Sequence, residues 1–183
     1  LSGAAPKPGK VAMVGYLMDR NEGDHRGSVA ELERMLGGLG LEAASIWLSG
    51  RPYESLREVR HAQAVVSLPH GREAGRVLAR RLKVKLIEAE LPFGLPASAR
   101  FVEQLGREMK RVKAAEAFIA AETSSASGLL GLGTAEAIKG RTFSFCGDPM
   151  HAVGFVEQIE ALGGKMGSML LIGGQHHLDD ALR

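Results

Sequence analysis

Short apolar runs alternate with segments of helical periodicity over the first half of the chain, and this alternation constrains the fold more than any other feature. Buried strands of a parallel sheet read as short apolar runs, and the crossovers between them have the period of a helix. The pattern predicts an α/β fold with a Rossmann-like parallel sheet flanked by helices over residues 10–96. The expected strands are residues 10–18, 41–50, 63–69 and 84–92, and the expected helices are residues 29–39, 52–62 and 71–82.

The first of these helices has both a start signal and a stop signal. Ser28 is expected to cap its N-terminus, and Glu31, three residues later, completes a capping box. A glycine-rich segment at 37–40 predicts its end. The apolar residues that repeat at helical spacing between these signals are Val29, Leu32, Met35, Leu36 and Leu39.

The second half of the chain follows a different pattern. Residues 97–140 predict a helical connection, and residues 141–183 predict the start of a further α/β domain. The connection is expected to hold a long helix over 98–122 that Gly106 weakly interrupts, a loop or helix kink over 123–133, and one or two helical turns over 134–140. The further domain is expected to run strand, helix, strand and helix, with bounds at 141–148, 149–164, 165–174 and 175–183. Residues 1–9 have the composition of an interdomain linker, so the sequence is expected to be a piece of a longer polypeptide.

Composition narrows the class of protein. The 183 residues carry a formal net charge of +2, which is too small to indicate nucleic-acid binding. No apolar run approaches the roughly 18 residues of a membrane span, and no signal peptide is recognisable. A single cysteine cannot form an internal disulfide, so a cytoplasmic location is expected. The small charge and the lack of a membrane span predict no nucleic-acid or membrane partner.

Ligands of open parallel sheets bind outside the carboxyl ends of the strands, so the loops after the strands hold the candidate site residues. No metal ligand is assigned among them, and no catalytic residue is identified. The candidates that line a pocket are Tyr16, Asp19, Asp24 and His25 after the first strand; Ser49 and Gly50 after the second; His70, Gly71 and Arg72 after the third; Pro92, Phe93 and Gly94 after the fourth; and Cys146, Gly147 and Asp148 after residue 145.

Each candidate loop has a plain interpretation beside the functional one. The carboxylate and imidazole side chains of the loop 19–27 could bind a divalent cation. Their spacing matches no EF-hand loop, and a solvated loop is favoured. The turn at His70 and Gly71 could hold an anion at a helix N-terminus with help from Arg72, and an ordinary strand-to-helix turn is the alternative. No GxGxxG sequence follows the first strand, which argues against a dinucleotide site. For residues 174–180, a surface helix is favoured over a metal site.

Cys146 could be a metal ligand, a nucleophile or a small buried residue near a ligand pocket. One cysteine cannot build a structural zinc or iron–sulfur site alone. His151 lies close in sequence, but no known nucleophile signature surrounds the pair. Cys146 is therefore expected to be a small buried residue near the end of a buried strand, beside a pocket.

Three stretches together resemble nitrogenase component 1 and its relatives, namely the molybdenum-iron protein subunits, the cofactor scaffold subunits and the dark-operative protochlorophyllide and chlorophyllide reductase subunits. Residues 10–50 resemble the opening of the family's second domain, a strand, a variable loop and a helix ending in "LGLE". Residues 91–106, "LPFGLPASARFVEQLG", resemble its "PxGxxxT" turn into a long helix, with Ser98 or Ala99 near the usual Thr. Residues 139–164, "KGRTFSFCGDPMHAVGFVEQIEALGG", resemble the opening of its third domain.

The resemblance implies a redox enzyme subunit that pairs with a homologous subunit in a hetero- or homo-oligomer and takes electrons from an ATP-dependent iron–sulfur reductase. It implies an iron–sulfur or related metal cluster in the complete protein and none bound by this chain alone, because the family's cluster cysteines lie mainly in a first domain that has no counterpart here. Cys146 does not match a family ligand position, so the chain is expected to supply pocket walls and to be inactive alone. A cofactor-assembly scaffold, or a non-enzymatic α/β module that binds a small anion, are the alternatives.

Overall fold

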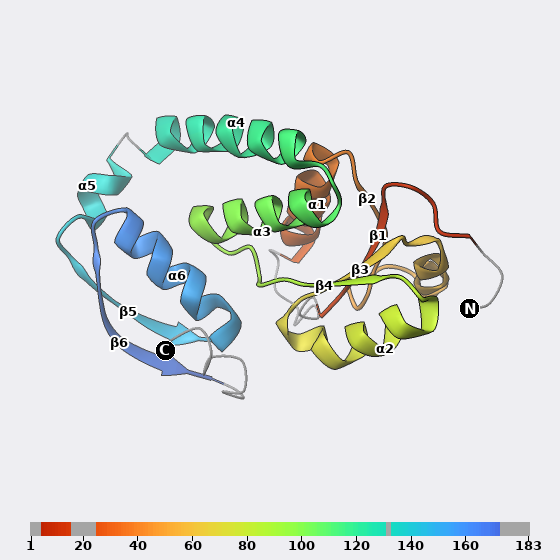
Figure 1. Cartoon of the computed structure of the whole chain (residues 1–183). Coiled ribbons are helices and arrows are strands. Elements are labelled where there is room, and N and C mark those ends of the chain that lie inside the picture. Colours follow the sequence, from red (N-terminus) through yellow and green to blue (C-terminus); the bar gives the residue numbers. More distant parts are fainter. Residues whose placement is uncertain (1–4, 16–24, 131–132, 173–183) are drawn as a thin grey trace. The chain divides into compact units, whose positions relative to one another are not determined.

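The computed structural model describes residues 5–15, 25–130 and 133–172. The chain divides into two compact units, Leu1–Ala89 with Gln104–Ala115, and Glu90–Glu103 with Glu116–Arg183 (Figure 1). Each unit has its own parallel sheet, which confirms the predicted α/β fold class.

The first unit is built on a four-stranded parallel sheet in the order β2-β1-β3-β4. The strands are β1 (Lys10–Val14), β2 (Glu42–Ile46), β3 (Ala64–Ser67) and β4 (Lys85–Glu88). The two central strands are almost completely buried, as expected for a parallel sheet with both faces covered. The chain leaves β1 toward β2 and leaves β3 toward β4, so the direction of winding reverses between β1 and β3.

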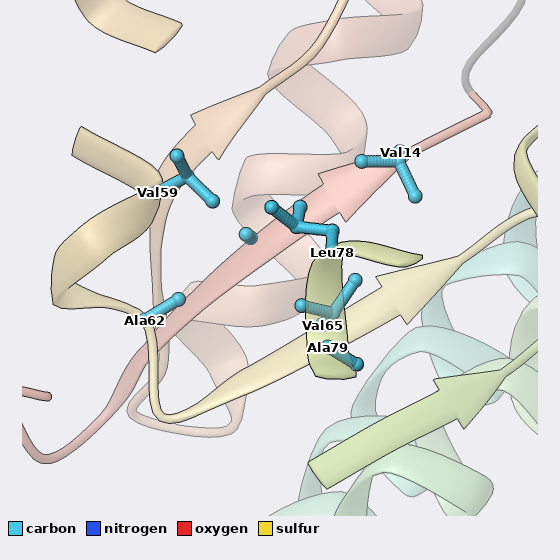
Figure 2. Close-up of a cluster of buried hydrophobic side chains, with 7 residues drawn as sticks. Val14, Val59, Ala62, Val65, Leu78 and Ala79 are labelled. Atoms are coloured by element: carbon cyan, nitrogen blue, oxygen red, sulfur yellow. The ribbon is translucent and has the colours of Figure 1, made fainter. Parts of the chain in front are cut away.

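Helical segments cover both faces of this sheet. On one face, the 3₁₀ helix η1 (Tyr53–His61) and the helix α2 (Arg72–Leu82) pack on side chains of β1 and β3 (Figure 2). Side chains alternate along a strand, so Val11 and Met13 face the other side, where α1 (His25–Gly38) lies (Figure 1). The buried residues of the first face are Ala12, Val14, Val59, Ala62, Val65, Leu78 and Ala79.

The predicted elements of this unit are present, with two differences. The helix α1 begins at His25, so Ser28 lies inside it and is not its cap. The segment after Pro52 is a 3₁₀ helix rather than an α-helix, and Val59 is the residue that it buries. A short, charged connector with so little apolar surface has little tertiary packing to favour an α-helix, and 3₁₀ turns are common in such connectors.

The helical connection consists of two helices where one was expected. α3 (Leu95–Glu108) and α4 (Val112–Leu130) are separated by a sharp turn, in which Lys110 has φ +58°. Arg111 N–H donates to Gly106 O and Lys110 N–H to Arg107 O, which is the Schellman pattern that ends a helix. Gly106 therefore does not interrupt the helix. A Cβ added there would lie 2.5 Å from the Ala115 Cβ, so Gly106 allows α3 and α4 to approach each other.

Two further predictions for this connection were tested. Of the two alternatives for 123–133, the loop is wrong as far as residue 130, because α4 continues to Leu130. The short helix after it is confirmed as α5 (Thr134–Ile138).

In the part of the chain that the structure describes, no helix is long and apolar enough to cross a lipid bilayer.

The second unit contains a two-stranded parallel sheet, β5 (Thr142–Gly147) with β6 (Lys165–Leu171), joined by α6 (Pro149–Ala161). The Phe145 ring lies 5.2 Å from the Phe155 ring, so α6 covers the face of β5 that carries Phe145. Exposure alternates along β5, and the opposite face carries Cys146. The expectation that Cys146 is buried is wrong, because it is exposed on the face that α6 does not cover.

Candidate functional site

The carboxyl ends of β1 and β3 meet through two glycines. A Cβ added at Gly15 would lie 2.2 Å from Gly71 N, and one added at Gly71 would lie 2.5 Å from Gly15 N. Leu68 N–H donates to Val14 O at 2.9 Å, and Gly71 N–H donates to Leu68 O at 2.9 Å, so the two loops are held together. The contact lies where the strand order reverses, which is the position at which open α/β sheets bind ligands. Backbone atoms rather than side chains form the surface at this point.

The turn after β3 places its three predicted site residues in different surroundings. His70 is exposed and Gly71 is buried. The half-buried Arg72 side chain donates a hydrogen bond to the carbonyl oxygen of Ser67, and the Ser67 side chain is completely buried. Arg72 thus supports the turn itself, and its contact with an anion stays a prediction.

A pocket of about 370 Å³ lies beside the carboxyl end of β2. The loop after β2 contributes Ser49, Gly50 and Arg51. The helix α1 contributes Arg26, Val29, Ala30 and Glu33. This pocket, which we call the α1–β2 pocket, includes two of the residues that the sequence singled out, Ser49 and Gly50.

Charged side chains dominate the polar part of the α1–β2 pocket. The Arg51 guanidinium pairs with the Glu33 carboxylate, and both side chains are partly buried. No ion pair joins Arg26 to another residue within 5–15, 25–130 and 133–172. Two guanidinium groups and one carboxylate leave the pocket with an excess of one positive charge.

Hydrogen bonds and backbone conformation fix the loop that forms one wall of the α1–β2 pocket. Leu48 and Gly50 have φ values of +60° and +71°, and they flank Ser49, which is 7% exposed. The Ser49 hydroxyl donates to Ile46 O at 2.7 Å. The wall is therefore already formed without a ligand.

In the second unit, the loop after β4 packs against α6. A Cβ added at Gly154 would lie 2.0 Å from Phe93 O, so only glycine fits there. Leu95 N–H donates to Gln158 Oε1 at 2.7 Å, and the Phe93 and His151 rings meet edge to face at 4.9 Å. The structure thus brings Phe93 and the neighbouring Gly94 together with α6. It also ties down Pro92, whose carbonyl oxygen accepts a hydrogen bond from the Ser98 hydroxyl at 3.2 Å.

The predicted residues Cys146, Gly147 and Asp148 are divided between two elements, because the first two end β5 and Asp148 precedes α6. Asp148 caps α6, because its carboxylate accepts a hydrogen bond from Met150 N–H at 2.8 Å. Gly147 is half-buried, and its carbonyl oxygen accepts a hydrogen bond from Ile172 N–H. Cys146 lies on the face of β5 that α6 does not cover, and it is exposed.

The remaining candidates lie outside what the structure describes. Tyr16, Asp19 and Asp24 fall in the segment 16–24, and His25 is described only as the first residue of α1. The expected helix over 175–183 is also outside the described residues. Among the residues that are described, no group of three or more His, Cys, Asp or Glu side chains is arranged to hold a metal ion.

Sequence reasoning missed the three charged residues of the α1–β2 pocket, Arg26, Glu33 and Arg51, as well as Val29 and Ala30. Arg51 lies in the loop after β2, and Arg26 lies in the first turn of α1, within the segment that the sequence predicts to be the loop after the first strand. The strand-end rule included both residues without selecting them. Glu33 lies two turns inside α1, where nothing in the sequence links it to the loop after β2. A charged residue facing Arg51 becomes visible only once the helix is placed beside the strand.

Comparison with protein families decides which family this architecture belongs to. The sequence matches the family described as nitrogenase component 1 type oxidoreductase over residues 2–180. The chain belongs to this family. The expectation drawn from the three resembling stretches is confirmed at this level.

Solved structures with the same fold include nitrogenase chains. The structures "Nitrogenase Cp1 at pH 5" and "Nitrogenase Cp1 at pH 6.5" each give a TM-score of 0.70, with 14% and 18% sequence identity over 91% and 96% of this chain. The chain spans 33% and 42% of those two nitrogenase chains. An ABC transporter substrate-binding protein from Listeria monocytogenes EGD-e gives a TM-score of 0.53, with 13% identity over 96% of this chain and 72% of its own. A search of curated proteins finds no significant match.

Proposed function

We propose that this nitrogenase component 1 type chain is part of an oxidoreductase subunit that receives electrons from an ATP-dependent iron–sulfur reductase. The family match over residues 2–180 carries the proposal. In this proposal, residues 10–96 form the family's central domain, residues 97–140 form a helical connection and residues 141–183 open a further domain. The subunit pairs with a homologous subunit in the cytoplasm.

The donor groups on the described residues decide what this chain contributes. Cys146 is exposed on β5, and the described residues hold no cluster of carboxylate, thiol and imidazole groups. These residues do not fit an iron–sulfur cluster, which is held by several cysteine thiolates. The proposed contribution is therefore the shape of the pocket walls, through the backbone contact of Gly15 with Gly71 and through the loop Pro92–Gly94 on α6.

The test is to produce the protein anaerobically from its natural gene together with the homologous subunit and the reductase. Iron content, visible absorption and ATP-dependent reduction by the reductase are then measured. The proposal expects iron, charge-transfer absorption and reduction that requires ATP. A folded, colourless assembly without iron, which the reductase does not reduce, would show that the proposal is wrong.

A further inference from the structure

The α1–β2 pocket has the size and the charge of a binding site for a small molecule. Ligand pockets generally hold about 300–1,000 Å³, and this pocket holds about 370 Å³. A bare metal ion or a single water molecule would leave most of that space empty. Val29 and Ala30 add apolar surface beside the charged groups. The pocket therefore suits a molecule with one charged head group and a short body.

The sign of the charge follows from the lining residues. A cation would meet two guanidinium groups and a single carboxylate, and that carboxylate already pairs with Arg51. An anion would meet Arg26 and Arg51. A guanidinium group has five N–H donors, so Arg51 keeps donors that its pair with Glu33 does not use. The forked donors of guanidinium match the oxygens of phosphate and carboxylate groups.

The wall formed by the loop after β2 is ordered before any ligand arrives. Ser49 is buried and bonded to Ile46 O, and Trp47 N–H donates to Met13 O at 2.9 Å. The Arg51 guanidinium is held by its ion pair with the Glu33 carboxylate. A site that needs no ordering on binding keeps more of its contact energy as affinity.

We propose that the α1–β2 pocket binds a small anionic molecule with a phosphate or carboxylate head group, which Arg26 and Arg51 hold. Glu33 positions Arg51 and limits the affinity, because its negative charge lies in the same pocket. The site involves residues of the first unit alone, and it stands whether or not the chain serves in a redox subunit.

The test is isothermal titration of the 183-residue protein with three probes: inorganic phosphate, glycerol 3-phosphate and succinate. Sodium chloride at matched ionic strength is the reference. Saturable binding of at least one probe at one site is expected, and the probe that binds identifies the head group. Absence of saturable binding by all three probes would overturn the proposal.

Three variants separate a built site from general charge attraction. Arg26→Ala removes a charged hydrogen-bond donor and is expected to weaken binding about ten-fold or more. Glu33→Gln removes the competing charge but keeps a side-chain oxygen that can accept the hydrogen bond from Arg51, so it is expected to strengthen binding about three-fold or more. Arg34→Ala is the matched control, because Arg34 is on the same helix, pairs with Glu31 and does not line the pocket. Equal weakening by Arg26→Ala and Arg34→Ala, or weaker binding by Glu33→Gln with its fold intact, would refute the proposal.

Discussion

Gly71→Ala is the substitution that most directly tests the contact between the loops after β1 and β3. The new Cβ would lie 2.5 Å from Gly15 N, 2.6 Å from Gly15 Cα and 2.7 Å from Val14 C. Carbon atoms normally pack at about 3.5–4.0 Å, so backbone atoms of the central strand must move by about 1 Å. Gly71 has φ −108°, which alanine adopts freely, so the effect is steric rather than conformational.

The expected cost follows from two opposing terms. Overpacking a core site costs about 1–3 kcal/mol, and we take the upper part of that range because the neighbours are hydrogen-bonded backbone. Replacing glycine by alanine recovers about 0.4–1 kcal/mol through the lower entropy of the unfolded chain. The net loss of unfolding free energy is about 2 kcal/mol. With a denaturant slope of about 2 kcal/mol/M, the urea midpoint of the first unit falls by about 1 M.

Urea unfolding followed by the fluorescence of Trp47, the only tryptophan, reports on this unit. Gly37→Ala is the matched control, because nothing lies within 4 Å of a Cβ added at Gly37 in α1. Alanine there is expected to raise stability by up to about 1 kcal/mol. If Gly71→Ala unfolds at the same urea concentration as the parent or follows the control upward, the close contact between Gly15 and Gly71 is wrong.

Three further predictions concern the second unit. Gly154→Ala places a Cβ 2.0 Å from Phe93 O and is expected to lower its unfolding free energy by about 3 kcal/mol, measured by hydrogen exchange in α6. Asp148→Ala removes the cap on Met150 N–H and is expected to cost about 1 kcal/mol by the same measurement, whereas Asp148→Asn should cost much less; equal losses would contradict the capping role. Cys146 is exposed and should react with a thiol reagent in the native protein at a rate close to that in urea; strong protection would contradict the observed exposure.

The sequence predicted the sheet and its core because both depend on local periodicity. The sequence predicted the end of α1, where glycine adopts the left-handed conformation, and the end of α2 at Leu82, but it missed the end of α3. Gly40 ends α1 as expected, with Leu41 N–H bonded to Leu36 O. Lys83 and Lys110 take the same conformation at the ends of α2 and α3, with φ values of +55° and +58°. A non-glycine residue in this conformation has no clear local signal, so the turn between α3 and α4 was read as a continuous helix.

The burial of Cys146 was misjudged for a different reason. Free cysteine is among the most often buried residue types, and this tendency was the ground for expecting Cys146 to be buried. In the described part of the second unit, α6 covers one face of β5, and exposure alternates along the strand. The sequence of a strand does not say which neighbours are present, so the same residues are compatible with either degree of burial.

Two close backbone approaches among the described residues explain why reactive side chains identify so little of the candidate site. At the end of β1, Gly15 and Gly71 exclude any side chain from the point where the winding of the sheet reverses. In the other unit, the contact between Gly154 and the Phe93 carbonyl oxygen leaves no space for a side chain at residue 154. A ligand at either place would contact main-chain atoms, whose positions depend on glycine rather than on a titratable group. This supports a role in shaping a pocket, and it predicts that substitutions at these glycines disturb binding and stability together, whereas Arg26→Ala disturbs binding of a small anion alone.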